Sequence, residues 1–246
     1  IDDVIEDPWG GMDTIGTFDR VIGSQQDDLL SAQGMTRSIS LFGENGADTL
    51  IGTDLPDYLN AGSGHDLILP GRPTGGFDIV RPGNGLDTVD FDGADQITVD
   101  YSYYALDLSD WDVPISTHLE HTADPIVASQ GTQGSTTLLN MDQVFDHARF
   151  NLETGNGDDT ISVNLDDVNW ISIFAGGGND TITLTGTPVP DAQIRVGVFR
   201  AATATVTDLT QGLVLDNGFG GQTLIEGVEL MTVFQGSGMA DSILGS

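Results

Sequence analysis

The chain has 246 residues and is 38% hydrophobic, so it can bury a core, but it carries a formal net charge of −31. All seven basic residues are arginines, too few for a basic patch, which disfavours binding to nucleic acid or to an anionic membrane. There is no cysteine, which excludes disulfides and thiolate zinc sites, and no apolar run of about 18 residues that could span a membrane. Aspartate outnumbers glutamate by 32 to 6, an excess that suits turns and oxygen cages around a hard cation.

Glycine-rich turns that end in aspartate recur from the N-terminus. The segment GGMDTI at 10–15 has the pattern, and QQDDLL at 25–30 is a weak copy; both are equally compatible with ordinary turns. The clearest block is residues 43–69, where Asp48, Asp57 and Asp66 are nine residues apart. An aliphatic residue follows each of them two positions later, and short β-prone runs lie between the turns.

A repeat of nine residues predicts six residues of turn and three of strand. If the chain reverses direction every nine residues, the central aliphatic side chains of successive repeats meet inside. Glycines permit positive φ and let carbonyls point at a common centre, while aspartate adds a carboxylate. Oxygen ligands without sulfur or imidazole indicate Ca²⁺. We therefore expect an all-β fold, a right-handed parallel β-roll or β-helix, with an irregular insertion that includes one short helix.

The spacing of the aspartates predicts two ladders, one on each side of the roll. Asp48 and Asp66 are 18 residues apart, and the steps from Asp57 to Asp78 and from Asp66 to Asp87 are both 21. One three-residue insertion near residues 70–72 explains both longer steps. The ladders then contain Asp48, Asp66 and Asp87 on one side, and Asp57, Asp78 and Asp95 on the other. Leu55 and Pro56 replace the expected glycine turn before Asp57, so we expect Asp57 to be a poor ligand.

Residues 96–150 interrupt the repeats with aromatic residues and few glycine turns, which predicts an insertion or subdomain. Helical spacing over 136–149 puts Leu138, Met141, Val144, Phe145 and Ala148 on one face. The cluster of Tyr101, Tyr103, Tyr104 and Trp111 is compatible with packing or with stacking on sugars. Asp107, Asp110 and Asp112 are compatible with a solvated loop, with a further Ca²⁺ site or with the paired carboxylates of a glycoside hydrolase. His118, Glu120 and His121 fit no zinc motif.

A second repeat block follows. Asp159 and Asp180 end the turns TGNGDD and AGGGND, again 21 residues apart, and GSGMADSI at 236–243 is a looser copy. The predicted organisation is a repeat block at 1–95, the insertion at 96–150, and a second block with a β-rich connector at 151–246. The chain stops at Ser246 directly after SILG, in the middle of a motif, and both ends look cut. We therefore expect a piece of a longer protein whose partners are neighbouring domains or copies of itself.

GENGADTLI, AGSGHDLIL, TGNGDDTIS and AGGGNDTIT resemble the calcium-binding nonapeptide repeats of the RTX family. The resemblance covers about a third of the chain and has no counterpart for 96–150. It implies a protein exported by a type I system from a Gram-negative bacterium, folding on calcium outside the cell. It does not fix an activity, since adhesins, surface-layer proteins and enzymes carry such repeats.

The expected function is a calcium-binding structural module of a secreted or cell-surface protein, with no catalytic residues of its own and with surface glycans as a further partner class. The alternative is a β-helical polysaccharide lyase or epimerase, with 96–150 as the wall of its active site. The candidate metal-binding residues are Gly43, Asn45, Asp48, Asp57, Gly62, Gly64, Asp66, Asp78, Gly83, Gly85, Asp87, Gly155, Gly157, Asp159, Gly176, Gly178 and Asp180.

Overall fold

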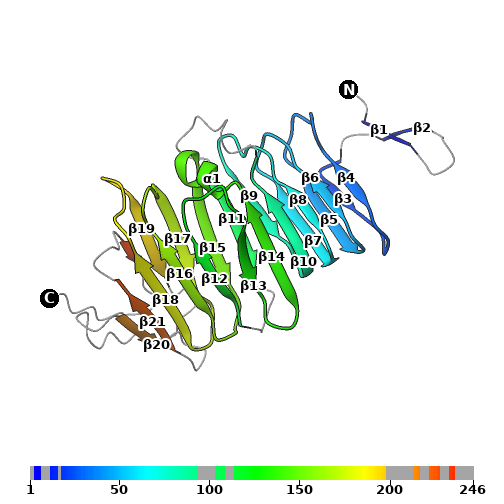
Figure 1. Cartoon of the computed structure of the whole chain (residues 1–246). Helices are drawn as coiled ribbons and strands as arrows, with labels where there is room; N and C mark the ends of the chain where they lie inside the picture. Colours follow the sequence, from blue (N-terminus) through cyan, green and yellow to red (C-terminus); the bar gives the residue numbers. More distant parts are fainter. Residues whose placement is uncertain are drawn as a thin grey trace.

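The computed structural model describes residues 3–6, 12–15, 18–92, 103–108, 114–197, 213–216, 222–227 and 233–235. This part of the chain is all-β apart from one short helix, as expected (Figure 1). The elements are β1 Asp3–Glu6, β2 Met12–Ile15, β3 Arg20–Ile22, β4 Leu29–Ser31, β5 Ser40–Asn45, β6 Thr49–Ile51, β7 Tyr58–Gly64, β8 Leu67–Leu69, β9 Phe77–Arg81, β10 Asn84–Asp90, β11 Tyr103–Leu108, β12 Ser116–Leu119, β13 Ile126–Ser129, β14 Gly134–Leu139, α1 Met141–His147, β15 Arg149–Thr154, β16 Thr160–Asn164, β17 Trp170–Phe174, β18 Asp180–Thr185, β19 Gln193–Gly197, β20 Leu213–Asp216, β21 Gln222–Glu226 and β22 Val233–Gln235.

The strands form two series that the chain visits in turn. In the first series, parallel pairing runs through β3, β5, β7, β9, β11, β15, β17, β19 and β22. In the second, it runs through β4, β6, β8, β10 and β14, and again through β12, β16, β18 and β21. Figure 1 shows the strands side by side in this order. We call one first-series strand and the following second-series strand a repeat.

The pairing registers agree with the spacing of the aspartates. Leu41 pairs with Leu59 and Leu50 with Ile68, which are steps of 18 residues. The next steps, from Tyr58 to Ile79 and from Leu67 to Thr88, are 21 residues. The three extra residues therefore lie in the turn between β8 and β9, at residues 70–76, which includes the expected place.

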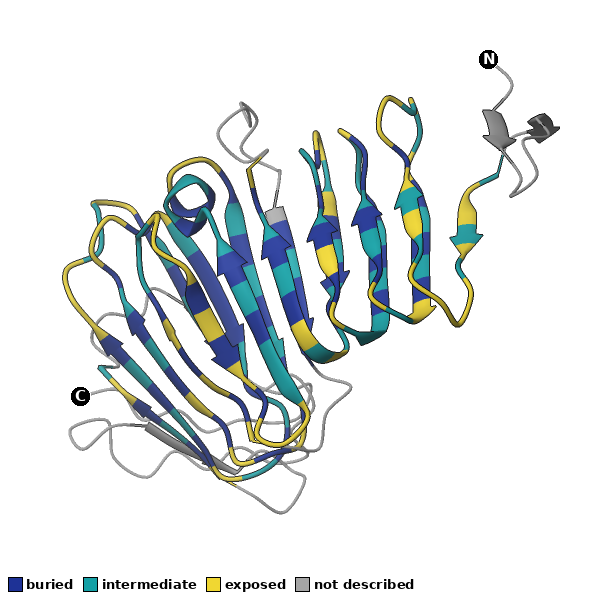
Figure 2. Cartoon of the chain, turned by 45° about the vertical axis from the view of Figure 1, so that its right-hand side comes forward, coloured by how far each residue is buried: buried dark blue, intermediate teal, exposed yellow. Residues whose placement is uncertain are grey.

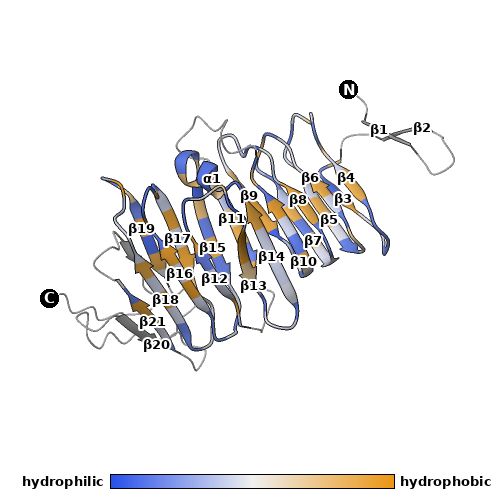
Figure 3. Ribbon diagram, in the orientation of Figure 1, coloured by the Kyte–Doolittle hydropathy of each residue, from blue (hydrophilic) through white to orange (hydrophobic). Residues whose placement is uncertain are grey.

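The central aliphatic residues of the repeats form the core, as the sequence predicts. Leu50, Leu59 and Ile68 are completely buried, and burial alternates along the strands of both series (Figure 2). Hydrophobic residues recur at a similar level from strand to strand, as the orange bands of the ribbon show (Figure 3). Because the side chains of a strand alternate between its two faces, one face of each strand packs inside and the other faces solvent.

The first copy of the motif, at 10–15, behaves differently. Its β2 pairs with β1 in an antiparallel two-stranded sheet and joins neither series. The looser copy at 236–243 lies outside the described residues.

Residues 96–150 contribute to both series. In the first series β11 lies between β9 and β15. In the second, β14 pairs with β10, and β12 pairs with β16. Between them lies β13, antiparallel to both of its neighbours. The second series thus has three strands where the first has one, which widens it by about 10 Å at ~4.8 Å per strand. The division into three regions stays a prediction, but these strands pair with both repeat blocks.

The extra width is filled by one helix and by aromatic rings. Met141, Val144 and Phe145 of α1 are buried. Phe91 packs on Tyr104 and Phe150 with ring centroids 4.8 Å and 6.1 Å apart, and Phe145 packs on Phe150 at 6.0 Å. Tyr104 is fully buried, so packing is its role. Tyr101 and Trp111 lie outside the described residues, and the Tyr103 side chain is not described.

The predicted helix begins too early. Residues 136–139 extend the strand β14, and Asn140, with φ of 61°, separates that strand from α1. The reason is that these residues, which include two β-branched threonines, pair with the edge of β10, and a pairing edge outweighs weak helical spacing. Among the described residues, no helix is long and apolar enough to cross a membrane.

Candidate metal sites

The turn aspartates lie just before a strand or in its first four residues, and their side chains are buried. Each is almost completely removed from solvent, with 4% or less of its surface exposed. This group consists of Asp48, Asp57, Asp66, Asp78, Asp87, Asp159 and Asp180. Burial of so many carboxylates is costly unless they are hydrogen-bonded or paired with cations.

One oxygen of each carboxylate joins successive repeats. In the second series, Asp48 N–H donates to Oδ1 of Asp66 at 2.8 Å, and Asp66 N–H donates to Oδ1 of Asp87 at 3.0 Å. Asp28 extends this ladder backwards, because its N–H donates to Oδ1 of Asp48 at 2.8 Å. The weak copy at 25–30 therefore takes part in the ladder.

The first series has its own ladder. Ile39 N–H donates to Oδ1 of Asp57, and Asp57 N–H donates to Oδ1 of Asp78, both at 2.8 Å. The two ladders that the spacing predicts are therefore present, although Asp95 lies outside the described residues.

The second repeat block continues the pattern in the second series. Ile115 N–H donates to Oδ1 of Asp159 at 2.8 Å, and Asp159 N–H donates to Oδ1 of Asp180 at 3.2 Å. Asp180 is followed one repeat later by Thr223, whose hydroxyl donates to Oδ2 of Asp180 at 2.8 Å. A threonine thus takes the place of the next aspartate.

The second carboxylate oxygen separates two kinds of turn. Oδ2 is buried without a hydrogen bond in Asp48, Asp66, Asp78, Asp87 and Asp159. Asp159 differs from the others because the Thr154 hydroxyl is close enough to lower the pKa of its carboxyl, against the larger effect of burial. All but Asp78 end a turn with glycine or a left-handed residue at its second position and glycine at its fourth, and Asp78 follows Gly75–Gly76.

Two turns without these glycines supply a hydrogen bond to Oδ2 from within the turn itself. In the turn before Asp57, Thr53 N–H donates to Oδ2 at 2.6 Å, and before Asp28, Ser24 N–H donates to Oδ2 at 2.5 Å. Leu55 is not among the described residues with positive φ. Leu55 therefore avoids the positive φ that a glycine turn would require, because this turn is of a different kind and its own N–H donates to Oδ2 of Asp57.

Burial dominates the electrostatics of these carboxyls. It raises the pKa of Asp66 to about 6, and those of Asp87 and Asp159 to about 7. It also holds the pKa of Asp78 well above its ordinary value. The hydrogen bonds from backbone N–H groups oppose these shifts only in part. Proximity to the preceding aspartate of the ladder adds to the shifts at Asp66, Asp78 and Asp87, so a cation at these turns would relieve a real penalty.

The glycines are required because the turns of successive repeats touch. A Cβ on Gly64 would overlap the carbonyl oxygen of Gly46, and one on Gly85 would overlap that of Gly64. Both have positive φ, of 156° and 144°. In the second block, Gly176 and Gly178 approach the carbonyls of Gly155 and Gly157 in the same way.

Gly62 and Gly83 also approach the backbone of the preceding repeat, but the equivalent position in the repeat before them is held by Glu44 instead of glycine. A Cβ on Gly62 would overlap the carbonyl oxygen of Glu44, and one on Gly83 would overlap that of Gly62. Glu44 pairs with Gly62 and keeps a φ of 80°, so a residue with a side chain occupies a position that otherwise takes glycine. Gly43 lies against Oδ2 of Asp48 and the Ala61 carbonyl.

Asn45 is placed differently from the other candidates. Its exposed side chain hydrogen-bonds Oε1 of Gln25 and does not enter the ladder.

The two histidines of residues 118–121 pair with carboxylates. Nε2 of His118 lies 3.7 Å from Oε2 of Glu120, and His121 contacts Asp146. Within the described residues, no group of three or more His, Asp or Glu side chains could hold a metal ion. Any metal at the turns would therefore take most of its ligands from backbone carbonyls.

Three residues of the ladders were not among the predicted metal-binding residues. Asp28, Thr53 and Thr223 contribute hydrogen bonds to the ladder. Asp28 and Thr223 lie one repeat away from predicted aspartates, and this spacing is the signal that could have found them, whereas Thr53 lies in the same turn as Asp57. Asp107 forms an ion pair with Arg81, with Nε 2.8 Å from Oδ2, while Asp110 and Asp112 lie outside the described residues.

Comparison with known proteins adds no relative. No family model, no curated protein and no solved structure matches the chain. The case for a function therefore rests on the residues themselves.

Proposed function

We propose that the chain is a calcium-binding structural module of a secreted or cell-surface bacterial protein of adhesin or surface-layer type. In this proposal its repeats wind as a right-handed parallel β-roll of the RTX kind. The observation that carries the proposal is the set of buried carboxylate oxygens without hydrogen bonds. Four of the five, those of Asp48, Asp66, Asp87 and Asp159, end glycine-bearing turns, and the turns before Asp28 and Asp57 donate an N–H to the same oxygen themselves.

The donor set fits calcium. Asp48, Asp66, Asp87 and Asp159 would supply carboxylate oxygen from the second-series turns, and Asp78 would supply it from the first. Carbonyls of the stacked glycine turns would complete the shell. Ca²⁺ takes six to eight oxygen ligands in flexible geometry, whereas Mg²⁺ demands a near-ideal octahedron. Bound calcium would neutralise the buried carboxylates and hold neighbouring repeats together.

Such sites would couple folding to the outside of the cell. Extracellular calcium modules bind with Kd of about 10⁻⁴ to 10⁻³ M. At calcium 10- to 100-fold above Kd, each site adds roughly 1.4 to 2.7 kcal/mol to the free energy of unfolding. A few sites would supply much of a total stability of ~5–15 kcal/mol. The chain would then stay unfolded where calcium is scarce and fold after export.

The test is a thermal melt with calcium, with excess chelator, and with magnesium in place of calcium. We expect chelator to lower Tm sharply, calcium to restore it and magnesium to fail. A melt that does not change in excess chelator contradicts the proposal.

A second candidate function is a polysaccharide lyase or epimerase. One observation favours it: a surface groove is lined by Arg149 and Arg195 as well as by Asp107 and Glu153, and lyases need cations to neutralise a uronate. Incubation with acidic polysaccharides, read as new ultraviolet absorbance, decides between turnover and a structural role. Sustained turnover would make the protein an enzyme.

A further inference from the structure

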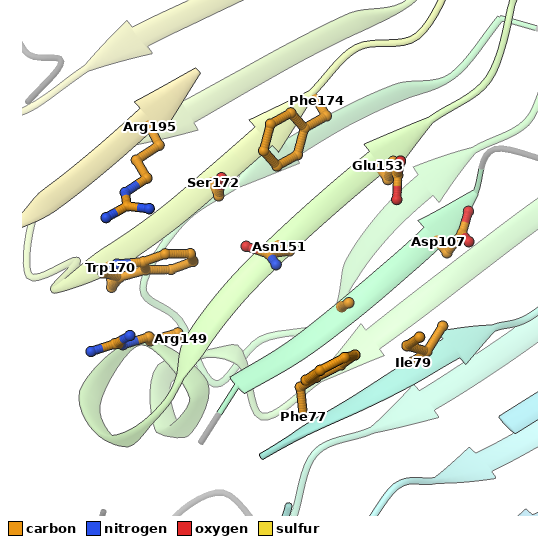
Figure 4. A pocket seen from close by; sticks show the side chains of 11 residues that line it. Phe77, Ile79, Asp107, Arg149, Asn151, Glu153, Trp170, Ser172, Phe174 and Arg195 are labelled. Atoms are coloured by element: carbon orange, nitrogen blue, oxygen red, sulfur yellow. The ribbon is translucent and has the colours of Figure 1, made fainter. Parts of the chain in front are cut away.

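A groove of about 450 Å³ lies on the outer face of the first series (Figure 4). It crosses five adjacent strands, from β9 to β19, and residues on these strands line it. The volume is in the range of sites that hold small molecules. It is separate from the aspartate ladders, because its lining residues alternate along the strands with the buried residues of the core.

One end of the groove is cationic. Trp170 lies between two arginines of the neighbouring strands, as Figure 4 shows. The guanidinium carbons of Arg149 and Arg195 are 5.7 Å and 5.4 Å from the centroid of its ring. Contacts of this kind hold a guanidinium in place, so less side-chain entropy is lost when it binds an anion.

Two polar atoms of the groove are buried and have no hydrogen-bond partner. They are Nε of Arg195, a donor, and Oδ1 of Asn151, an acceptor. Asn151 lies between the arginine end and the other end, where Asp107 and Glu153 are found (Figure 4). Leaving such groups unpaired costs about 1–3 kcal/mol each, so their presence points to a polar ligand.

The charge of the groove contrasts with that of the chain. Of the six arginines that the structure describes, three lie in the groove or beside it, since Arg81 pairs with Asp107. The groove lining holds two arginines and two carboxylates, so it is neutral on a chain with a net charge of −31, and its positive charge is confined to the arginine end. The field of the whole chain repels anions, so an anion would bind only where guanidiniums act at short range.

We propose that this groove binds an acidic oligosaccharide. A carboxylate of one sugar unit would lie between Arg149 and Arg195, and hydroxyls of neighbouring units would donate to Asn151, Asp107 and Glu153. Phe77, 39% exposed, and Phe174 supply apolar surface for sugar rings at the sides of the groove. The extent over five strands suits a short oligomer better than a single ring, and the mixture of donors and acceptors suits hydroxyls. The proposal goes beyond calcium binding and does not depend on it.

The test is isothermal titration calorimetry with tetragalacturonate and with its methyl ester, which has the same rings without the charges. Calcium is kept constant, and the heat of each ligand added to calcium buffer is subtracted. We expect the acid to bind and the ester to bind at least tenfold more weakly. Equal binding of the ester, or no binding of the acid, overturns the proposal.

Variants locate the site. Arg195→Gln should weaken binding of the acid at least tenfold. Arg20→Gln is the matched control, because Arg20 makes the same kind of contact with Phe42, at 4.2 Å, outside the groove, and it should change affinity by less than about twofold. Asn151→Asp adds a repelling carboxylate with no change in size and should weaken the acid but not the ester. Unchanged Tm shows that each variant is folded.

A competition experiment separates another ligand class. An acidic peptide such as hexaglutamate should not compete with the oligosaccharide, and competition by it would replace the glycan site with a general anion site. Binding of the acid that survives Arg195→Gln contradicts the assignment to this groove.

Discussion

The backbone N–H of Asp48 donates a 2.8 Å hydrogen bond to Oδ1 of Asp66, the aspartate at the same position one repeat later. The motif aspartate therefore has two functions. One oxygen fastens its repeat to the preceding one, and this bond needs no metal. The other oxygen is buried and unpaired in Asp66 itself. Replacing a carboxylate by an amide separates the two functions, because an amide keeps one acceptor oxygen and removes the charge.

Asp66→Asn should therefore remove the calcium response of its site and leave the ladder bond intact. Asp57→Asn should keep the calcium response and weaken the hydrogen bonds of the ladder. Its amide nitrogen would meet the donor N–H of either Thr53 or Ile39, so one hydrogen bond is lost at a cost of about 1–3 kcal/mol with or without calcium. Calcium titrations followed by Tm compare the two variants. Equal loss of the calcium response in both would mean that the unpaired oxygen does not mark the metal sites.

The metal-free protein should lose stability as pH rises from about 4 to 7. Burial raises the pKa of Asp66 to about 6 and those of Asp87 and Asp159 to about 7, against an unfolded value near 3.9. The folded state thus binds more protons than the unfolded state in this window, and the free energy of unfolding falls as these protons leave.

Denaturant melts in chelator at several pH values measure this slope. Salt at about 0.5 M screens the repulsion between surface charges and leaves buried carboxyls largely unscreened. Asp87→Asn should flatten the slope. Saturating calcium should reverse the trend, since calcium displaces protons and binds better at high pH. Metal-free stability that rises from pH 4 to pH 7 at high salt would contradict the burial of these groups.

The aspartate ladders could be predicted because a nine-residue period fixes which residues are neighbours. The two registers through the insertion at 70–76 follow from arithmetic on Asp57, Asp66, Asp78 and Asp87. The antiparallel β13 could not be predicted in this way, since it has no copy elsewhere in the sequence. Its position depends on the edges of β12 and β14, which come together only after folding.

The groove could not be predicted from the sequence either. Its residues come from five strands, so Phe77, Asp107, Arg149, Trp170 and Arg195 share no local motif.

The turn before Asp57 could be predicted only in part. The missing glycine indicated an unusual turn, but the hydrogen bond from Thr53 that resolves it depends on the path of the backbone.

Two glycine-to-alanine substitutions should distinguish the stability cost of an overlap between turns from the cost of a left-handed backbone. Gly85→Ala would place a Cβ against the carbonyl of Gly64, and we expect a loss of several kcal/mol or no folding. Gly34 has positive φ, of 83°, but no atom within 4 Å of an added Cβ. Gly34→Ala should therefore cost only ~1–2 kcal/mol, the price of a left-handed conformation. Urea melts in saturating calcium measure both. Similar losses would mean that the turns do not stack closely.

Phe145→Ala tests whether the widened part of the fold belongs to a common core. Phe145 is fully buried, and its ring lies 6.0 Å from that of Phe150. Loss of a buried phenylalanine ring costs about 3–5 kcal/mol. Tm should fall by roughly 6–20 °C, since 1 kcal/mol corresponds to ~2–4 °C in a chain of this size. Phe77→Ala, on the outer face, is the matched control and should cost much less.

The calcium response of Phe145→Ala should be unchanged. In the first series the ladder position of Asp78 passes to Tyr104 and then to Phe150, so aromatic side chains replace carboxylates where the second series widens. The variant should melt in one transition that shifts with calcium as the parent does, because β11 and β14 pair with strands of the repeats. A separate early transition confined to residues 103–150, followed by hydrogen exchange, would show that this region folds apart from the repeats.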